Sequence, residues 1–322
     1  TVMGSSSGGL SVCVLLTTSG SFGLFQRAVI QSGGCHVRMS SKSLAQRQSL
    51  KLANAVGCSS AQGRMTCLRA KTAAQLATAL KVDQPLPGGL LFGTVNPPVW
   101  LPFVDGTILA AQPGVMLEAS KAHFVEVIVG SNRDEARGFA HGLLGSVSPK
   151  TDKEYLHAIG RRFGVQAHEV VARYPPATLG GYDKALAQVG TDAFFTCPAR
   201  RTAKALAGYT TAYRYHFEHE PTGAFMPEIG VFHGAEIPYV MGNSDTGAMG
   251  DLQGNGIEVS ALVQGYWVRF AKTGNPNGGG DPVWPKWSDE DPHMRFTNSA
   301  GADTELRKEA CDFWDTIPFH EE

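Results

Sequence analysis

The chain has 322 residues, of which 43% are hydrophobic and 18% are charged, so a substantial core is possible and a disordered chain is not expected. Its 28 Lys and Arg against 29 Asp and Glu give a formal net charge of −1, which excludes a dominant basic footprint for nucleic acid or an anionic membrane. The longest wholly apolar runs, such as residues 12–16, are far shorter than the roughly 20 residues that span a bilayer, so we expect no transmembrane segment.

Four short segments are predicted as strands, each followed by a loop. The first is residues 1–3, which run into GSSSGG, and the second is residues 28–32, which end at two glycines. Residues 124–129 are apolar and close on a glycine, and residues 212–218 alternate aromatic with polar side chains, as strands do.

Three helices are predicted between and after these strands. Residues 44–56 have a possible cap at Ser43, apolar side chains recur every 3–4 positions over residues 259–270, and residues 305–317 form a terminal helix. Strands alternating with helices indicate an α/β protein with a mostly parallel sheet. Residues 85–106 are rich in proline and glycine and are predicted as a long loop, and no linker-like stretch divides the chain.

Residues 4–8, GSSSG, fit the pattern G-x-S-x-G. This spacing suits a nucleophile on a sharp strand-to-helix turn, because flanking glycines avoid a side-chain clash there and the helix that follows directs backbone N–H groups at developing negative charge. The pentapeptide alone also fits a Ser/Gly linker. The strand stub before it and the apolar run over residues 10–16 favour the nucleophile turn.

The chain resembles the type-B carboxylesterase and cholinesterase family. GSSSGGLSVCVLL and GLFQRAVIQSGG carry the resemblance, and four further blocks follow in order: PFVDG (102–106), GSNRDEARGF (130–139), FHGAEIPYVMG (232–242) and FAKTGNPN (270–277). The resemblance implies the α/β-hydrolase fold, with residues 1–322 as the C-terminal portion of a single domain that begins at the nucleophile turn.

The resemblance assigns Ser6 as nucleophile, Glu135 as the acid and His233 as the base. The order Ser…Glu…His is the one this fold uses, and each residue follows a predicted strand. The Ser7 N–H would serve the oxyanion hole. Taken singly, Glu135 would be an ordinary solvated loop carboxylate, and His233 is one of ten histidines.

Supporting residues follow from the same resemblance. Ser32 matches a serine that bonds the acid, and Glu236 matches a glutamate near the histidine. The expected substrate-binding positions are Phe139, which would line the active-site gorge, and Met39, Asn96 and Pro98, which would leave the acyl pocket roomier than that of a cholinesterase.

Two departures from the family affect the expected activity. The residues flanking the nucleophile are Ser5 and Ser7 where the family usually has Glu and Ala, so we predict a weaker attraction for cationic substrates. The family's glycine-rich loop with the second oxyanion donors precedes the nucleophile, and the GGG at 278–280 is no substitute for it. We therefore expect the chain to be part of a longer polypeptide, whose complete form carries the activity.

The six cysteines form no CxxC pair, which disfavours zinc and redox motifs. We discount a metal at His216 and His219, because side chains at that spacing on a strand face opposite sides. The resemblance pairs Cys58 with Cys67 and Cys197 with Cys311. Such disulfides indicate a secreted or periplasmic protein, whereas six reduced thiols would indicate a cytosolic one. The sequence contains no N-x-S/T sequon, and the other two cysteines are expected to be buried free thiols, namely Cys13 and Cys35.

The leading hypothesis is a serine esterase that needs no cofactor, acts on small-molecule carboxylic esters and forms an acyl-enzyme. Two alternatives stay open at this point: a non-catalytic binding protein related to cholinesterases, and a hydrolase of the same fold acting on lipids, amides or thioesters.

Overall fold

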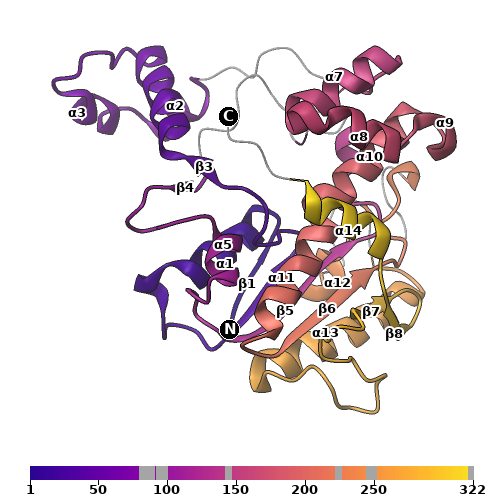
Figure 1. The fold of residues 1–322 in the computed structure, drawn as a ribbon. Coiled ribbons are helices and arrows are strands. Elements are labelled where there is room, and N and C mark those ends of the chain that lie inside the picture. Colours follow the sequence, from indigo (N-terminus) through magenta and orange to yellow (C-terminus); the bar gives the residue numbers. More distant parts are fainter. Residues whose placement is uncertain (80–90, 92–100, 142–146, 222–226, 244–251, 318–322) are drawn as a thin grey trace.

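The computed structural model describes residues 1–79, 91, 101–141, 147–221, 227–243 and 252–317 (Figure 1). Its centre is a six-stranded sheet in the order β1-β2-β5-β6-β7-β8, parallel except for the last strand, which runs antiparallel to β7. The strands are β1 (Val2–Ser5), β2 (Arg27–Gln31), β5 (Glu126–Asn132), β6 (Ala212–Phe217), β7 (Pro292–Phe296) and β8 (Ala300–Thr304).

All four predicted strands are present within three residues of their expected bounds, and the mostly parallel sheet is confirmed. Strands β7 and β8 were not predicted. Strand β7 begins with a proline, and β8 is an exposed edge strand of sequence AGADT, so neither carries the usual strand signal.

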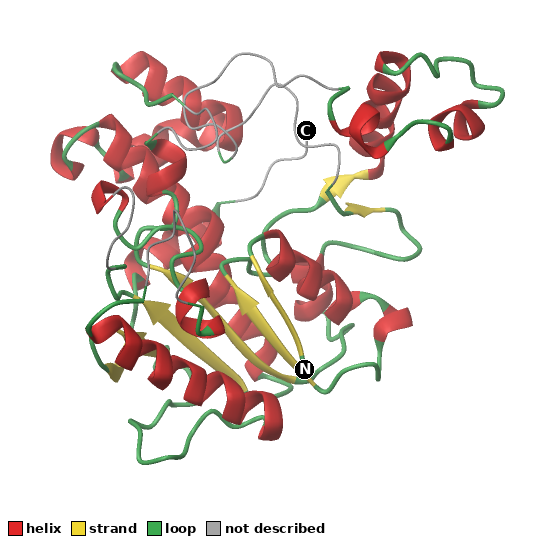
Figure 2. Ribbon diagram, turned by 180° about the vertical axis from the view of Figure 1, so that it is seen from behind, coloured by secondary structure: helices red, strands yellow, loops and turns green. Residues whose placement is uncertain are grey.

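Helices cover both faces of the sheet (Figures 1 and 2). Alternate residues of the central strands point to opposite faces, as a period of two requires. Ile30 and Val127 pack with α1 (Ser7–Thr17), α5 (Pro113–Glu118) and α11 (Cys197–Ala207). On the other face, the apolar side of α13 (Asn255–Thr273) packs against Val29, Ile128 and three aromatic residues of β6: Tyr213, Tyr215 and Phe217.

A third apolar cluster lies in a group of helices that follow β5, together with the terminal helix α14 (Lys308–Thr316). This group is drawn at the upper right of Figure 1. Its helices are α6 (Arg137–Ala140), α7 (Asp152–Phe163), α8 (Ala167–Arg173), α9 (Pro176–Leu179) and α10 (Tyr182–Thr191). A π-helical turn, Asp192–Thr196, continues α10 into α11.

A smaller unit leaves the sheet after β2 and lies at the upper left of Figure 1. It contains the short strand pair β3 (Ser40–Ser41) with β4 (Phe103–Val104), and the helices α2 (Lys42–Ala55), α3 (Arg64–Arg69) and α4 (Ala73–Ala77). Helix α2 starts two residues before its predicted start, because Ser41 rather than Ser43 caps it by accepting a hydrogen bond from the Leu44 N–H.

The predicted loop over residues 85–106 falls largely outside the described residues, although its end forms β4. The terminal helix begins at Lys308 rather than at residue 305, because Glu305 and Arg307 have positive φ angles of 57° and 55°, which an α-helix does not accommodate. The described residues also include the short helix α12 (Ile237–Met241) and 3₁₀ turns at Ser19–Ser21, Gly164–Gln166 and Pro227–Ile229. None of the described helices is long and apolar enough to cross a bilayer.

The structure contains three disulfides, and no cysteine among the described residues is free. The pairs Cys58–Cys67 and Cys197–Cys311 match the pairing that the family resemblance implies. The expectation of free thiols at Cys13 and Cys35 was wrong. Helix α1 packs against the loop that follows β2, which brings these two Cα atoms within 5.1 Å, and the residues form a disulfide.

Candidate active site

Ser6 occupies the turn between β1 and α1 and has the strained backbone angles φ 58° and ψ −121°. Gly4 is needed here, because a Cβ atom on it would lie 2.3 Å from the backbone oxygen of Gly8, whereas a Cβ atom on Gly8 would have no other atom within 4 Å. The Ser6 N–H donates to the Gln31 carbonyl at 2.9 Å, and a Cβ atom on Gly33 would lie 2.5 Å from the Ser6 oxygen. The turn is therefore fixed against the end of β2.

Glu135 and His233 form a charge-assisted pair in which the Glu135 carboxylate is fully buried. Glu135 Oε2 lies 2.6 Å from His233 Nδ1. Glu135 Oε1 accepts two further hydrogen bonds, from Ser32 Oγ at 2.6 Å and from the Asn132 N–H at 2.7 Å. Each oxygen of the carboxylate is thus bonded, as a buried charge requires.

A second buried carboxylate, Glu236, lies beside this pair. Its Oε2 accepts from Asn132 Nδ2 at 2.5 Å, and its Oε1 accepts from Gln31 Nε2 at 3.0 Å and from Ser5 Oγ at 3.4 Å. Burial and the neighbouring charge of Glu135 raise the pKa of Glu236 above its ordinary value. Glu236 thereby links the strand that carries Ser5 to the strand that carries Asn132.

The His233 ring is held by aromatic side chains as well as by Glu135. The ring centroids of Phe195 and Phe139 lie 4.8 and 5.4 Å from that of His233. Burial lowers the pKa of His233, but the charge and hydrogen bond of Glu135, with a further contribution from Glu236, outweigh it, so the pKa is raised.

Ser6 directly follows β1, and His233 contacts Glu135, which follows β5, so both lie at the carboxyl edge of the sheet. Within the described part of the chain, His233 is hydrogen-bonded to Glu135 and not to the Ser6 hydroxyl. Serine–histidine hydrogen bonds are often long in unliganded sites and shorten when substrate is bound. Ser7, the first residue of α1, is exposed, and its N–H lies at the helix N-terminus.

The predicted substrate-binding residues differ in where they lie. Phe139 contacts the catalytic histidine candidate, as described above. Met39 is buried, and its backbone exchanges hydrogen bonds with the Gln112 side chain at 2.8 and 3.0 Å, in a packing role at the base of the smaller unit. Asn96 and Pro98 lie outside the described residues.

Three residues around the site were not predicted from the sequence: Gln31, Asn132 and Phe195. A signal existed for the first two, because polar side chains at the carboxyl ends of buried parallel strands lie where this class of fold places its sites. Phe195 lies in the π-helical turn, and nothing in the sequence pattern indicated its position against His233.

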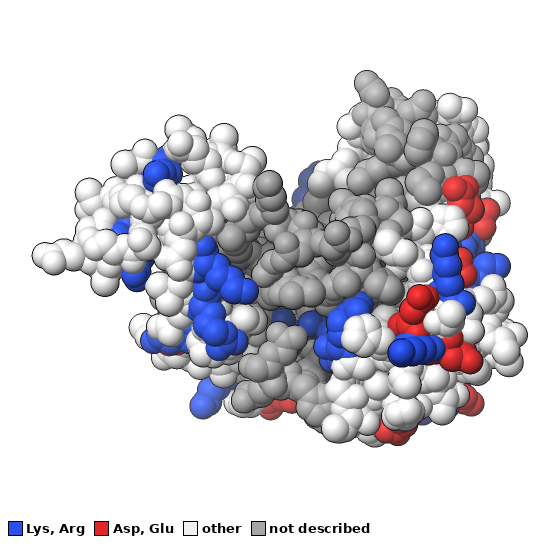
Figure 3. Space-filling view, turned by 90° about the horizontal axis from the view of Figure 1, so that it is seen from above, with Lys and Arg blue, Asp and Glu red and all other residues white. Residues whose placement is uncertain are grey.

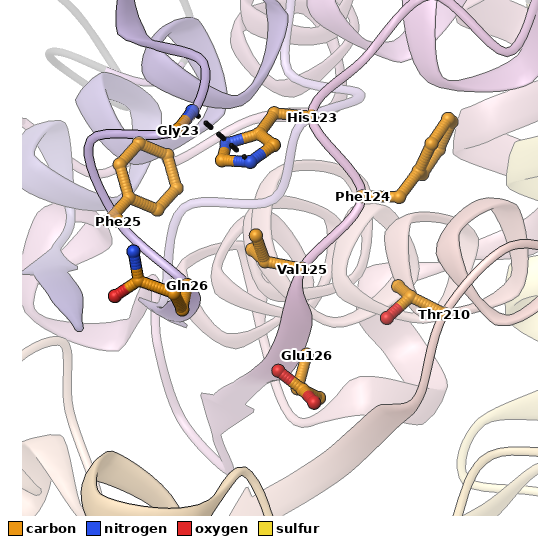
Figure 4. Close-up of a pocket in the computed structure, with 8 residues that line it drawn as sticks. All are labelled: Gly23, Phe25, Gln26, His123, Phe124, Val125, Glu126 and Thr210. Atoms are coloured by element: carbon orange, nitrogen blue, oxygen red, sulfur yellow. Dashed lines mark hydrogen bonds between the residues drawn. The ribbon is translucent and has the colours of Figure 1, made fainter.

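Two cavities in the described structure lie away from these residues. One of about 300 Å³ opens at the amino ends of β2 and β5, where the Gly23 N–H lies 3.4 Å from His123 Nε2 beside the Phe25 ring (Figure 4). Another of about 830 Å³ lies between α8 and the start of α14. Neither is lined by Ser6, Glu135 or His233. The described residues contain no group of three or more His, Cys, Asp or Glu arranged to hold a metal ion.

Comparison with known proteins identifies the family. The model of the carboxylesterase family matches residues 1–314. The chain belongs to the carboxylesterase family. Among its curated relatives, acylcarnitine hydrolase of Rattus norvegicus is 26% identical over 340 residues, covering 99% of this chain and 57% of the relative. Cholinesterase of Mus musculus is 31% identical over 337 residues, covering 98% of this chain and 55% of the relative.

The solved structure of a PNB esterase is similar in fold, with a TM-score of 0.78 at 22% identity, and the match covers 97% of this chain and 62% of that one. This carboxylesterase-family chain therefore has the α/β-hydrolase fold. It spans a little more than half the length of the curated relatives that it matches.

Proposed function

We propose that this chain carries the catalytic residues of a carboxylic ester hydrolase, with Ser6 as nucleophile, His233 as general base and Glu135 as the acid that orients the base. The observation that carries the proposal is the 2.6 Å contact between the buried Glu135 and His233 Nδ1. Because Nδ1 faces Glu135, the other ring nitrogen, Nε2, is available to the Ser6 hydroxyl. The strained turn at Ser6 supports the assignment of the nucleophile.

The reaction follows from these positions. His233 removes the proton of the Ser6 hydroxyl as its oxygen attacks the ester carbonyl, and a tetrahedral intermediate forms. His233 then gives that proton to the leaving alcohol, which produces an acyl-enzyme. A water molecule deprotonated by His233 attacks the acyl carbon, releases the carboxylic acid and restores Ser6. Glu135 stabilises the imidazolium in both steps.

The oxyanion of each intermediate needs hydrogen-bond donors. The Ser7 N–H is the donor that this chain supplies, because it lies at the N-terminus of α1 directly after the nucleophile. The second donors of the family belong to a glycine-rich loop that precedes the nucleophile in the complete fold. Full turnover is accordingly proposed for the complete protein.

The family relationship supports a substrate class, and the disulfides support a compartment. The family and its relatives support small-molecule carboxylic esters as the substrate class. Disulfides persist in oxidising compartments, so the three in this chain support a secreted or periplasmic protein.

The test compares wild type with Ser6→Ala and with Ser11→Ala, a control one helical turn away. We expect p-nitrophenyl butyrate hydrolysis and labelling by a fluorophosphonate probe in wild type and in the Ser11 variant, and neither in the Ser6 variant. Probe attachment mapped by mass spectrometry to another serine would contradict the assignment of the nucleophile. A complete, folded protein that is neither labelled nor active would favour a non-catalytic binding role, whereas activity found in the complete protein and not in this chain would show that the second oxyanion donors are required.

A further inference from the structure

The near-zero net charge conceals an uneven distribution of charge along the chain. Residues 1–82 contain nine Lys and Arg and no Asp or Glu, so residues 83–322 contain 19 Lys and Arg against 29 Asp and Glu. Seven of the nine basic residues fall in residues 38–79, the segment that includes β3, α2, α3 and α4. We call this segment the arm.

The arm is a separate protrusion that presents its charges to solvent. It forms the lobe on the left of Figure 3, where Lys and Arg are spread over the surface, while Asp and Glu gather on the opposite side of the molecule. Helix α2 turns Gln48, Leu52 and Ala53 inward and leaves Lys42 and Arg47 exposed. Arg69, at the end of α3, is also exposed.

Four of the seven arm cations take part in no ion pair within the described structure. None of its ion pairs includes Lys42, Arg47, Arg69 or Lys71. The arm itself offers no carboxylate side chain, so its positive charges add to one another. A cluster of one sign on a protruding unit produces a positive potential that attracts a polyanion.

The composition of the arm restricts the kind of polyanion. Residues 38–79 contain no Phe, Trp or Tyr. Single-stranded nucleic acids bind on aromatic stacking platforms, peripheral helices enter membranes through aromatic and large apolar side chains, and protein interfaces centre on aromatic anchors. The arm has two large exposed apolar side chains, Leu50 and Met65, and the strand β4 that pairs with β3 adds the exposed Phe103 at its base.

The covalent structure of the arm restricts the compartment. The disulfide Cys58–Cys67 closes the loop between α2 and α3 and places the arm in an oxidising environment. Anionic polysaccharides are the common polyanions there, whereas nucleic acid is not. From the unpaired charge, the missing aromatic residues and the disulfide, we infer that the arm is a docking surface for an anionic polysaccharide.

Binding to this surface is electrostatic and follows simple rules. Sulfate and carboxylate groups at intervals along a sugar chain contact several arm cations at once. Because the contacts are exposed, salt screens them, and the affinity falls steeply as the Debye length shortens from about 14 to about 7 Å between roughly 50 and 200 mM salt. The surface is separate from Ser6, Glu135 and His233, so docking holds the protein on a matrix without entering its site.

The test measures binding of the full chain to immobilised heparin, which is sulfated, to polygalacturonate, which is carboxylated, and to neutral dextran. The arm variant is Lys42→Gln, Arg47→Gln, Arg69→Gln, and the matched control replaces three exposed lysines elsewhere: Lys150→Gln, Lys153→Gln, Lys286→Gln. We expect binding to at least one anionic polymer and not to dextran, with about tenfold weaker binding in the arm variant and less than twofold change in the control. Which polymer binds identifies the source of the anionic groups.

Four results would overturn the inference: no binding to either anionic polymer, equal loss in the arm and control variants, preferential binding to phosphatidylserine vesicles, or self-association in sedimentation that the arm variant abolishes. The last two would assign the surface to a membrane or to a second copy of the chain. Esterase activity measured on the same samples is expected to be unchanged, so this outcome is independent of the proposed function.

Discussion

Glu135 and His233 are joined through one carboxylate oxygen, while the other oxygen of Glu135 is held by Ser32 and by the Asn132 N–H. Ser32, directly after β2, and Asn132, at the end of β5, therefore hold the Glu135 carboxylate in one orientation, with its other oxygen facing the imidazole. Hydrogen bonding at Nδ1 determines which tautomer His233 adopts, and so keeps Nε2 free to accept a proton.

Replacing Glu135 by Gln tests this role of the carboxylate. Glutamine fits the same space but cannot stabilise the imidazolium, and it favours the wrong tautomer. We expect kcat for p-nitrophenyl butyrate to fall by about 10³–10⁴ with little change in KM. Matched circular dichroism spectra would show that the variant is folded. A loss below tenfold would contradict the assignment of Glu135.

The pH dependence of the rate follows from the direction of the His233 pKa. Only the neutral imidazole accepts the serine proton, so kcat/KM falls as the pH drops through the pKa of His233, which is raised above its ordinary value of about 6.5. Glu236→Gln removes one of the charges that raise this pKa, and we expect the acidic limb to move to lower pH. A limb that moves to higher pH, or stays in place, would show that Glu236 does not act on His233.

Ser5 is expected to affect the preference for charged substrates. The family usually has a glutamate at this position, and in this chain the Ser5 hydroxyl donates to the buried Glu236, whose pKa is raised. We expect Ser5→Glu to increase kcat/KM for acetylthiocholine relative to an uncharged thioester by about tenfold, in line with roughly 1.4 kcal/mol of added attraction. Ser5→Gln is the control for side-chain size and should leave the ratio unchanged.

Local features of the site could be predicted from the sequence, and long-range features could not. The turn at Ser6 could be recognised from residues 4–8, because the close approach of Gly4 to Gly8 is a local steric requirement. The contact between Asn132 and Glu236 depends on how β5 sits between β2 and β6, which no short pattern encodes. Strand β8 was missed for a similar reason, since its pairing with β7 forms an edge that its own composition does not indicate.

The disulfide Cys13–Cys35 joins the helix that follows the nucleophile to the loop that follows Ser32. In that region a Cβ atom on Gly9 would lie 3.0 Å from the Gln31 oxygen, so α1 rests directly on the end of β2. We expect the double variant Cys13→Ala, Cys35→Ala to lower kcat and the rate of fluorophosphonate labelling by about tenfold, because small shifts of positioned groups reduce rates strongly.

The double variant Cys58→Ala, Cys67→Ala is the matched control, because that disulfide lies on the arm. Both variants should lose roughly 2–4 kcal/mol of unfolding free energy, but only the first should lose labelling rate at a temperature where both are folded. Equal labelling rates in the two variants would limit the Cys13–Cys35 bond to a role in stability.

Two buried histidines should make the fold sensitive to acid. His216 and His293 have ring centroids 6.5 Å apart on adjacent strands, where their neighbours include Arg214, Arg295 and the carboxylates of three residues, Glu218, Asp291 and Asp303. Burial, and after it the charge of Arg214, lowers the pKa of His293 to about 4 and that of His216 well below 6.5.

The lowered pKa values of these two histidines destabilise the fold as the pH falls. Between about pH 6.5 and pH 4 the unfolded chain takes up a proton on each of these histidines and the folded chain does not, so the unfolding free energy falls as the pH falls, by up to about 1.4 kcal/mol per pH unit for each. The raised pKa of His233 acts in the opposite direction.

His293→Leu should remove part of this acid sensitivity, because neither ring nitrogen of the buried His293 has a hydrogen-bond partner among the described residues. Urea unfolding at pH 7, 6 and 5 would measure it. We expect the variant to lose less unfolding free energy between pH 7 and 5 than wild type, whereas His157→Gln, at an exposed position, should leave the pH dependence unchanged. Parallel pH curves for wild type and His293→Leu would mean that His293 takes up its proton over the same pH range in the folded and unfolded chains, and would contradict the prediction.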